Sequence, residues 1–425
     1  MSKKHWFPPQ SRNTCLLKWG WSSLYLWTGT SSSCHRVDNV KFDVDKFNFH
    51  NTEKVVADRT SMLAGKWPGR GCESCRDQEK YGGVSDRMHW LSNDYNKKYV
   101  PQELINNPSQ TNIEPTMLEV YFNNKCNMKC MYCGPFLSSA WVAEEKRFSN
   151  KDVDIRFDSE IVQPWELDET YKHTLEKFYE YMEKSYSRLR EFHILGGEPF
   201  IQQETWDCID WMIQHPNPDL DFELFTNMQI KPKLFKEKME KLKELTKYCN
   251  TVEITASIDC WGDASEYVRT GLELDVFETN MKYLLEECPE IIVTMNWTVN
   301  SLSIHTTPEL IEKTLYWNTI KKNPTPIAVN YNKCISPETF DPHIMPKGTY
   351  TRYIQRIKEL NKQMYGETNT YMQYVDSIFK EVEESPARPN KILELVQYLD
   401  KMDIRRNSNW RTTFPWLVDI HNGIC

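Results

Sequence analysis

The sequence predicts an α/β protein whose central unit is a partial (β/α)6 barrel of the TIM type. A small irregular module precedes this barrel, and a helical extension follows it. From about Thr116 to Asn332, strand-like and helix-like segments alternate, which is typical of βα units that build a parallel sheet. The first 100 residues contain few helical patterns, whereas apolar residues after Thr349 recur at helical spacing. We therefore divide the chain into residues 1–105, 112–335 and 345–425.

Six apolar segments carry the strand signal. They are Leu118–Phe122, Phe192–Leu195, Phe222–Thr226, Val252–Ser257, Ile291–Val299 and Ile327–Tyr331. Helical stripes of apolar residues lie between them, in Tyr171–Arg190, Thr205–His215, Lys233–Tyr248 and around Phe277–Leu285. The active site of such a barrel lies at the carboxyl ends of the strands, so the residues that follow each strand are the first functional candidates.

Composition excludes several classes of protein. Hydrophobic residues make up 40% of the chain and charged residues 26%, which is ordinary for a globular protein. No apolar run approaches the roughly 18–20 residues of a membrane span, and Met1–Pro9 has no apolar signal-peptide core, so we expect a cytoplasmic protein without membrane contact. A net charge of −8 gives no reason to expect binding to nucleic acid.

Cysteine usage points to metal chemistry. The chain has 13 cysteines, and in a reducing compartment clustered cysteines are more often metal ligands or catalytic groups than disulfides. Cys126, Cys130 and Cys133 form a C-x3-C-x2-C run directly after the first strand. Three thiolates can hold three irons of a cubane cluster and leave the fourth iron open to a ligand. A structural zinc site is the alternative, but no fourth His or Cys lies close by in the sequence.

Further candidates follow the second, third and fourth strands. The second strand leads into Gly196–Pro199 (Gly-Gly-Glu-Pro), the third into Asn227, and the fourth into Ser257 and Asp259, with Arg269 after them. Two glycines allow a ligand to approach the backbone closely, a carboxylate can accept hydrogen bonds from an amine, and an arginine suits a carboxylate. Taken alone, these residues would equally fit a tight turn, a helix cap and a surface ion pair.

Together, the C-x3-C-x2-C loop and the Gly-Gly-Glu-Pro turn resemble those of the radical S-adenosylmethionine (radical SAM) enzymes. The resemblance implies that Cys126, Cys130 and Cys133 hold a [4Fe–4S] cluster whose open iron binds S-adenosylmethionine. It also implies a set of cofactor-binding residues: Gly196, Gly197 and Glu198 near the amino group, Tyr132 near the adenine, Ser257 near the ribose, Arg269 near the carboxylate, and Asn227 and Asp259 in the matching strand-end motifs. The family's usual glycine after the aspartate is Cys260 here.

The first part of the chain contains a second set of cysteines: Cys15, Cys34, Cys72 and Cys75. Four cysteines with one C-x2-C pair are also common in structural zinc sites. Here the pair precedes Glu79 and a Gly-x-x-Ser-x-Arg run from Gly82 to Arg87. This pattern resembles the auxiliary-cluster module of the SPASM and twitch radical SAM proteins, although in the best-known members the module follows the barrel. The resemblance implies a second, fully coordinated [4Fe–4S] cluster, which suits electron transfer.

The resemblance implies an enzyme that reductively cleaves S-adenosylmethionine to a 5′-deoxyadenosyl radical, which abstracts hydrogen from an unidentified substrate. A flavodoxin or ferredoxin is the implied electron donor. Relatives with such modules act on peptides, protein side chains and small molecules, and we favour a peptide or protein because that class is common among them. The alternative function is a non-catalytic electron carrier or scaffold that binds iron–sulfur or zinc on the same fold. The sequence assigns no catalytic residue on the substrate side.

Overall fold

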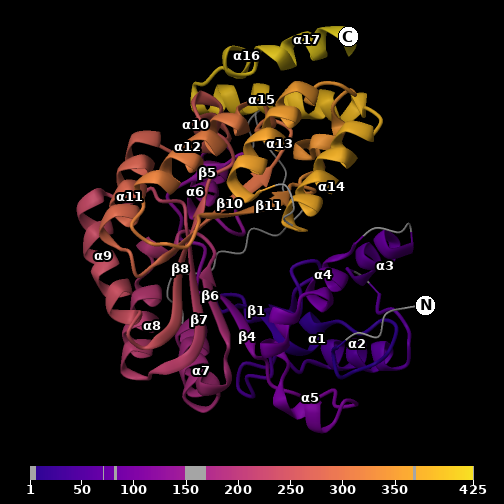
Figure 1. The fold of residues 1–425 in the computed structure, drawn as a ribbon, viewed down its shortest axis with the longest axis vertical. Coiled ribbons are helices and arrows are strands. Elements are labelled where there is room, and N and C mark those ends of the chain that lie inside the picture. Colours follow the sequence, from indigo (N-terminus) through magenta and orange to yellow (C-terminus); the bar gives the residue numbers. More distant parts are fainter. Residues whose placement is uncertain (1–5, 70, 81–83, 149–168, 367–369, 425) are drawn as a thin grey trace.

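The computed structural model describes residues 6–424 except 70, 81–83, 149–168 and 367–369 (Figure 1). These residues form a mixed α/β structure around one nine-stranded sheet, with the strand order β11-β10-β8-β7-β6-β4-β1-β2-β3. A separate two-stranded ladder joins β5 (Lys129–Cys130) to β9 (Arg269–Thr270). The large sheet positions the strand ends that carry the candidate residues, and the small ladder holds the cysteine loop.

Six neighbouring strands of the sheet are parallel, and they confirm the six strands predicted from the sequence. They are β4 (Met117–Tyr121), β6 (Glu191–Leu195), β7 (Asn217–Thr226), β8 (Cys249–Ser257), β10 (Ile292–Val299) and β11 (Ala328–Lys333). Strand neighbours follow the chain order without reversal, as they do in a barrel that has been opened between its first and last strands.

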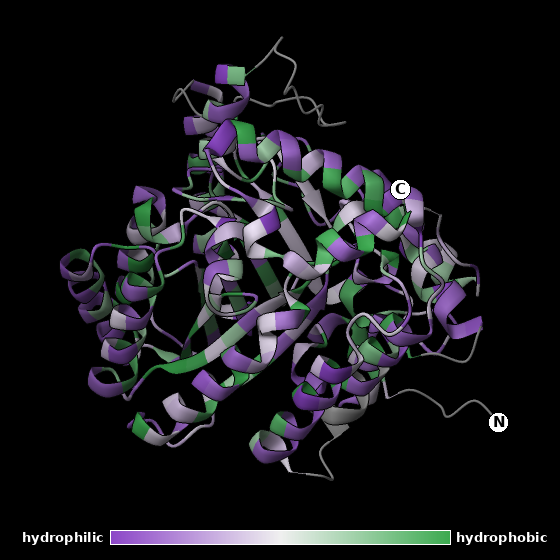
Figure 2. Cartoon of the chain, turned by 90° about the horizontal axis from the view of Figure 1, so that it is seen from above, coloured by the Kyte–Doolittle hydropathy of each residue, from purple (hydrophilic) through white to green (hydrophobic). Residues whose placement is uncertain are grey.

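Helices connect these strands and gather along one face of the sheet, as Figure 1 shows. The connecting helices are α7 (Glu169–Ser185), α8 (Gln203–Gln214), α9 (Pro232–Leu245), α11 (Leu274–Glu287) and α12 (Thr307–Ile320). The strand order advances in one direction, and crossovers between parallel neighbours are right-handed in nearly all proteins, so successive connecting helices accumulate on one side of the sheet. Figure 2 shows apolar and polar residues side by side along the helices, as amphipathic helices require.

Side-chain alternation separates the two faces of the parallel strands. Phe192 and Ile194 of β6 are fully buried in the main hydrophobic core, which includes the helical residues Phe178 and Met182. The residue between them, His193, faces the other way and forms ion pairs with Glu191 at 2.8 Å and Glu223 of β7 at 3.0 Å. Since successive strand residues point to opposite faces, the face without connecting helices is the polar one.

The N-terminal segment adds three strands to the same sheet. β1 (Trp21–Tyr25) pairs in parallel with β4, and β2 (Thr30–Ser32) and β3 (Val40–Lys41) follow in antiparallel pairing. The sheet therefore crosses the predicted boundary between residues 1–105 and 112–335. The segment nevertheless has a second hydrophobic cluster of its own, which contains Trp19, Met62 and Leu104.

Regular structure is more extensive in this segment than its sequence pattern suggests. Its described helices include α1 (Leu16–Gly20), α2 (Glu53–Leu63), α3 (Cys72–Lys80), α4 (Asp86–Ser92) and α5 (Gln102–Asn106). The Thr52 side chain caps α2 by accepting from the Val55 backbone nitrogen, and Ser85 caps α4 by accepting from Met88. These helices are short or weakly amphipathic, so periodicity alone gave little signal for them.

The described residues of the C-terminal segment are helical and form α13 (Thr351–Tyr365), α14 (Thr370–Glu384), α15 (Pro389–Arg406), α16 (Trp410–Thr413) and α17 (Pro415–Ile424). In Figure 1 these helices lie at the end of the sheet where β5 and α6 (Ser139–Phe148) are also found. No helix in the described part of the chain is both long and apolar enough to cross a membrane.

Candidate functional site

The cysteine loop follows β4 and is fixed on both sides. Cys130 lies in β5, opposite Arg269 of β9 in the antiparallel ladder. Trp141 of α6 donates from its indole nitrogen to the Cys130 carbonyl oxygen at 3.0 Å, and the Ser139 hydroxyl accepts from the Cys126 backbone nitrogen at 3.0 Å. The loop is therefore clamped between the start of α6 and the segment after α10 (Asp263–Val268).

The three thiols of the loop lie close enough to influence one another. Burial raises the pKa of Cys126, and the nearby Cys130 and Cys133 thiols raise it further. Burial and Cys130 likewise raise the pKa of Cys133 to about 12. Burial also raises the pKa of Cys130, but the positive charge of Arg269 opposes this effect. Three grouped thiols that burial keeps protonated would give up their protons to a bound metal.

No group of three or more His, Cys, Asp or Glu side chains within the described ranges is already arranged to hold a metal ion. Polar groups from neighbouring elements surround the loop. These groups come from the ends of β6, β7 and β8, which are the strands that follow β4 in the sheet.

The glycine turn after β6 packs directly on the start of the loop. Gly196 and Gly197 both have positive φ angles, +87° and +59°, which side chains rarely adopt. A Cβ atom at Gly197 would collide with the Lys125 carbonyl oxygen, and one at Gly196 would collide with the Tyr121 ring. The two glycines are thus required by a close approach between this turn and the cysteine loop.

Glu198 ties the glycine turn to the neighbouring strand. Its backbone nitrogen donates to the Lys125 carbonyl oxygen at 2.8 Å. Its carboxylate accepts from the Phe200 nitrogen at 3.1 Å, the Thr226 hydroxyl at 2.9 Å and the Asn227 nitrogen at 2.6 Å. The side chain is fully buried, and burial raises its pKa to about 7. Both oxygens are engaged by the chain itself, so the half-buried backbone of Gly196 and Gly197 is what this turn presents.

Two amide side chains complete the support of the loop. The Gln202 amide nitrogen donates to the carbonyl oxygens of Gly196 at 2.8 Å and Lys125 at 3.2 Å. Asn227 donates to the Asn127 side chain at 2.8 Å. Asn227 was among the sequence-predicted site residues, whereas Gln202 was not. A single glutamine three residues after a proline gives no signal in one sequence.

Tyr132, Asp259 and Arg269 form a buried hydrogen-bonded group beside the loop. The Tyr132 hydroxyl donates to Asp259 Oδ2 at 2.7 Å and accepts from Arg269 Nη1 at 2.7 Å. Arg269 Nη1 also lies 3.2 Å from Asp259 Oδ1, which accepts from the Thr298 backbone nitrogen at 3.1 Å. Burial raises the pKa of the Asp259 carboxyl, and the adjacent Arg269 opposes this effect. Ser257 ends β8 two residues before Asp259 and is half-buried.

Arg269 retains one unused donor. Its Nε atom is buried and has no hydrogen-bond partner among the residues that the structure describes. A buried donor without an acceptor is costly, and an anionic group bound beside the loop would remove that cost. The chain therefore brings three grouped thiols, a glycine turn and an arginine with a vacant donor to one place. These donors fit a [4Fe–4S] cluster with an open iron and a carboxylate-bearing ligand such as S-adenosylmethionine.

The four N-terminal cysteines converge as well, although they are spread over 61 positions of sequence. Cys15, Cys34, Cys72 and Cys75 all line one pocket, together with Lys18 and other side chains. Burial raises the pKa of Cys34 to about 12, and it also raises that of Cys15, where the Cys34 thiol adds to the effect. This donor set suits either a second [4Fe–4S] cluster or a zinc ion.

The residues that follow the C-x2-C pair form a single polar group. Glu79 accepts from the Ser85 hydroxyl at 2.6 Å and from Arg87 Nε at 2.9 Å, and Arg87 also donates to the Thr14 carbonyl oxygen at 2.9 Å. Gly82 of the same run lies outside the described residues. These contacts connect α3 and α4 to the residue before Cys15.

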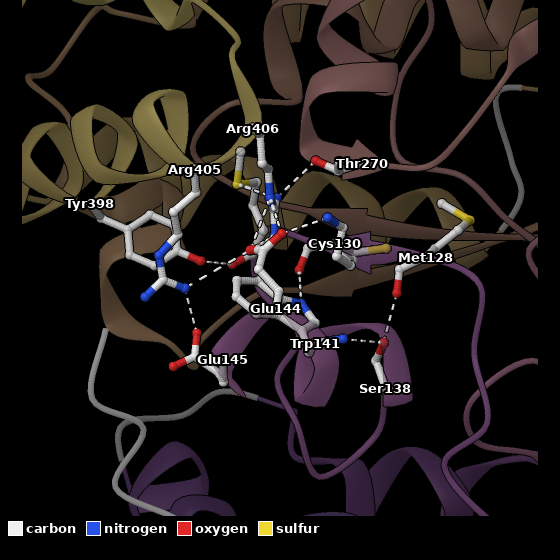
Figure 3. Close-up of polar contacts among 12 residues, drawn as sticks. Met128, Cys130, Ser138, Trp141, Glu144, Glu145, Thr270, Tyr398, Arg405 and Arg406 are labelled. Atoms are coloured by element: carbon white, nitrogen blue, oxygen red, sulfur yellow. Dashed lines mark hydrogen bonds and ion pairs between the residues drawn. The ribbon is translucent and has the colours of Figure 1, made fainter. Parts of the chain in front are cut away.

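A second set of charges supports the loop from the C-terminal helices (Figure 3). Arg405 and Arg406 are the last two residues of α15. In the structure they form ion pairs with Glu145 and Glu144 of α6. The two arginines are neighbours in the sequence, and so are the two glutamates. Because about 260 positions separate the arginines from the glutamates, one sequence does not show that they pair.

Comparisons with known proteins give only distant likenesses. No protein-family model matches the chain, and no curated protein matches it. Among solved structures, Streptococcus suis SuiB bound to its precursor peptide SuiA aligns with a TM-score of 0.36 at 13% identity, covering 83% of this chain and 68% of that one. The same protein bound to S-adenosylmethionine gives 0.37 at 15% identity with the same coverage. TYW1 with a lysine–pyruvate adduct gives 0.29 at 12% identity, covering 56% and 70%. At these TM-scores, neither the fold nor any residue role is taken from these proteins.

Proposed function

We propose that this chain is a radical SAM enzyme that abstracts hydrogen from a substrate, for which we favour a peptide or protein. The observation that carries the proposal is the meeting of the C-x3-C-x2-C loop with the glycine turn and Arg269. The glycine turn packs on the start of the loop, and Arg269 lies opposite Cys130 with a buried, unused Nε donor. An electron carrier would have no need for a vacant arginine beside its cluster.

In this proposal, Cys126, Cys130 and Cys133 hold a [4Fe–4S] cluster and leave one iron open. When bound, the cluster supplies the electron that cleaves S-adenosylmethionine to methionine and the 5′-deoxyadenosyl radical, which then takes a hydrogen atom from the substrate. The chain's own residues bind and orient the cofactor. Arg269 receives the carboxylate on its free Nε donor, and the half-buried backbone of Gly196 and Gly197 lies near the amino group.

Most of the other predicted residues hold Arg269 or the glycine turn in place. Tyr132 and Asp259 hold the Arg269 guanidinium in place by hydrogen bonds. Glu198 and Asn227 hold the glycine turn and the loop together from the end of β7. We assign the ribose to Ser257, which ends β8 and is half-buried. His193, Glu191 and Glu223 form a largely buried, ion-paired group on the sheet face without connecting helices.

The four N-terminal cysteines hold a second [4Fe–4S] cluster in this proposal, and a flavodoxin or ferredoxin supplies electrons. The surrounding pocket carries Lys18, Arg36 and Arg87, whose positive charges offset the negative charge of four thiolates. A zinc ion in the same pocket is the competing assignment. Replacing Cys72 and Cys75 by alanine should lower the iron content by about half if both sites hold four-iron clusters. Unchanged iron with loss of zinc would reverse the assignment.

The decisive experiment measures 5′-deoxyadenosine formation by anaerobically reconstituted protein with S-adenosylmethionine and a strong reductant. The wild type should form it, and the variant with Cys126, Cys130 and Cys133 replaced by alanine should not. Cys208→Ala is the matched control, because this fully buried thiol of α8 lies in the main core. Equal product from the triple variant would exclude the assigned cluster, and no product from an iron-loaded wild type, with or without candidate peptides, would favour the electron carrier.

A further inference from the structure

The last turn of α15 reaches the cysteine loop through Arg406 (Figure 3). Its Nε and Nη2 atoms contact the Glu144 carboxylate at 3.0–3.2 Å. Its Nη1 atom donates to the Thr270 hydroxyl at 2.8 Å and lies 3.3 Å from the Met131 sulfur. The guanidinium also lies over the Trp141 ring, 4.6 Å from its centroid. One buried side chain thus contacts four residues from three separate segments.

Each of these partners is part of the support of Cys130. Met131 is the next residue in the chain, and Trp141 donates to the Cys130 carbonyl oxygen. Thr270 pairs with Lys129 in the ladder that also pairs Arg269 with Cys130. Glu144 forms a second ion pair, with Lys129, so this carboxylate joins the loop to Arg406. Removing Arg406 would therefore release contacts on both sides of one predicted cluster ligand.

Two further residues of α15 contact the same region. The Tyr398 hydroxyl donates to the Met131 carbonyl oxygen at 2.8 Å. Arg405, whose side chain is fully buried, forms an ion pair with Glu145 of α6. Three residues of α15 thus contact either the cysteine loop or α6, the helix that follows it. The exposed Arg411, by contrast, pairs with Asp400 within the C-terminal segment itself.

We propose that Arg406 is a positioning residue that fixes the Cys130 side of the metal-binding loop and places a positive charge beside it. Through Arg406, the C-terminal helices set both the retention and the reduction potential of a cluster bound to Cys126, Cys130 and Cys133. This inference rests on the proposed function, since it concerns the cluster assigned there. A positive charge near an anionic cluster favours its reduced state, and partners that orient a metal ligand strengthen metal binding.

The test compares Arg406→Gln, Arg406→Lys and the control Arg411→Gln in the full-length, reconstituted protein. Two quantities are measured under anaerobic conditions. The first is the rate of iron release to a chelator, and the second is the midpoint potential of the loop cluster, obtained by EPR titration. Signals from the triple cysteine variant are subtracted, so that only the loop cluster is followed. Arg406→Gln should release iron about 10-fold faster and show a more negative potential. Arg406→Lys should keep the potential near the wild-type value while losing iron faster, because lysine keeps the charge but not the planar fork.

Tyr398→Phe is a milder variant that tests the contact of α15 with the loop without removing a charge. It removes one hydrogen bond to Met131 without changing any charge, so it should speed iron release and leave the potential unchanged. If Arg406→Gln matches Arg411→Gln in both measurements, the inference is overturned. Should Arg406→Gln fail to fold, Arg406→Lys decides: faster iron release at an unchanged potential supports the inference, and iron release at the wild-type rate overturns it. A wild-type loop that binds no iron would instead overturn the proposed function.

Discussion

Cys130 and Arg269 lie directly opposite each other in the two-residue antiparallel ladder between β5 and β9. This pairing places the guanidinium beside the thiol, where its positive charge opposes the effect of burial on the Cys130 pKa. The backbone therefore fixes the distance between the predicted metal-binding loop and the predicted anion-binding arginine. A ligand that bridges the two would meet a prearranged site, which lowers the ordering cost of binding.

Tyr132→Phe should weaken the binding of S-adenosylmethionine about 10-fold, since a hydrogen bond to a charged group contributes roughly 1.5–3 kcal/mol. The substitution removes the hydroxyl that links Arg269 to Asp259 and leaves the guanidinium less well oriented. Anaerobic titration calorimetry on reconstituted protein would measure the change. Tyr350→Phe is the control, because that buried hydroxyl donates to the Ser301 carbonyl oxygen, away from the loop. Equal affinities for both variants would contradict the assigned role.

Gly197→Ala should loosen the cysteine loop and reduce its iron content after reconstitution. The residue has a positive φ angle, and its Cβ atom would collide with the Lys125 carbonyl oxygen. Gly262→Ala provides the control, since Gly262 also has a positive φ angle, +77°, but its Cβ atom would meet nothing within 4 Å. Both variants share a backbone strain of roughly 1 kcal/mol, and only Gly197→Ala adds the collision. Similar iron contents would show that the close approach is not required.

Lys18→Met should destabilise the N-terminal segment and release the metal that we propose its four cysteines bind. Lys18 is only 2% exposed and forms an ion pair with Asp58 at 2.8 Å, beside the pocket that the four cysteines line. Breaking a buried pair typically costs ~3–5 kcal/mol, and we expect the lower end because Lys54 also pairs with Asp58.

Lys54→Met is the matched control for this prediction, since Lys54 contacts the same carboxylate but its side chain is 49% exposed. Its loss should cost about 0.5 kcal/mol or less. Thermal unfolding followed together with metal release would compare the two variants. An equal effect of both would show that burial of Lys18 adds nothing to the stability of the pocket.

His305 should make the C-terminal packing sensitive to acid. Its ring stacks on Trp416 at 3.8 Å and is buried, and burial lowers its pKa to about 3, with Arg352 adding to the effect. The folded state therefore keeps the imidazole neutral, whereas the unfolded chain takes up a proton below about pH 6.5. Stability is lost as the pH falls from 6.5 towards 3, by about 2 kcal/mol at pH 5.

Melting temperatures at pH 7.5 and 5.0 would test this prediction. His305→Phe keeps an aromatic ring on Trp416 and should reduce the drop in melting temperature on acidification. His215→Phe is the control, because His215 also stacks on a tryptophan, Trp211, at 4.0 Å but is exposed. If the melting temperature of His305→Phe fell on acidification by as much as that of the wild type, other groups would cause the acid sensitivity.

Features that depend on neighbouring residues were predictable from the sequence. The six parallel strands were placed to within a few residues because apolar runs bounded by turns are local signals. The cysteine loop was placed after the first strand for the same reason. Short motifs also predicted Tyr132, Asn227, Asp259 and Arg269. The structure joins Tyr132, Asp259 and Arg269 to one another by hydrogen bonds, and it joins Asn227 to Asn127 of the loop.

The tertiary structure decided which distant residues meet. It buried the Glu198 carboxylate between β6 and β7, where both oxygens accept hydrogen bonds from the chain, and it brought Gln202 onto the loop. It gathered four N-terminal cysteines around one pocket and continued the parallel sheet into β1. It also paired Arg406 with Glu144. Periodicity and motifs act over a few residues, whereas these contacts follow from how whole elements pack, so their partners become known only in the folded chain.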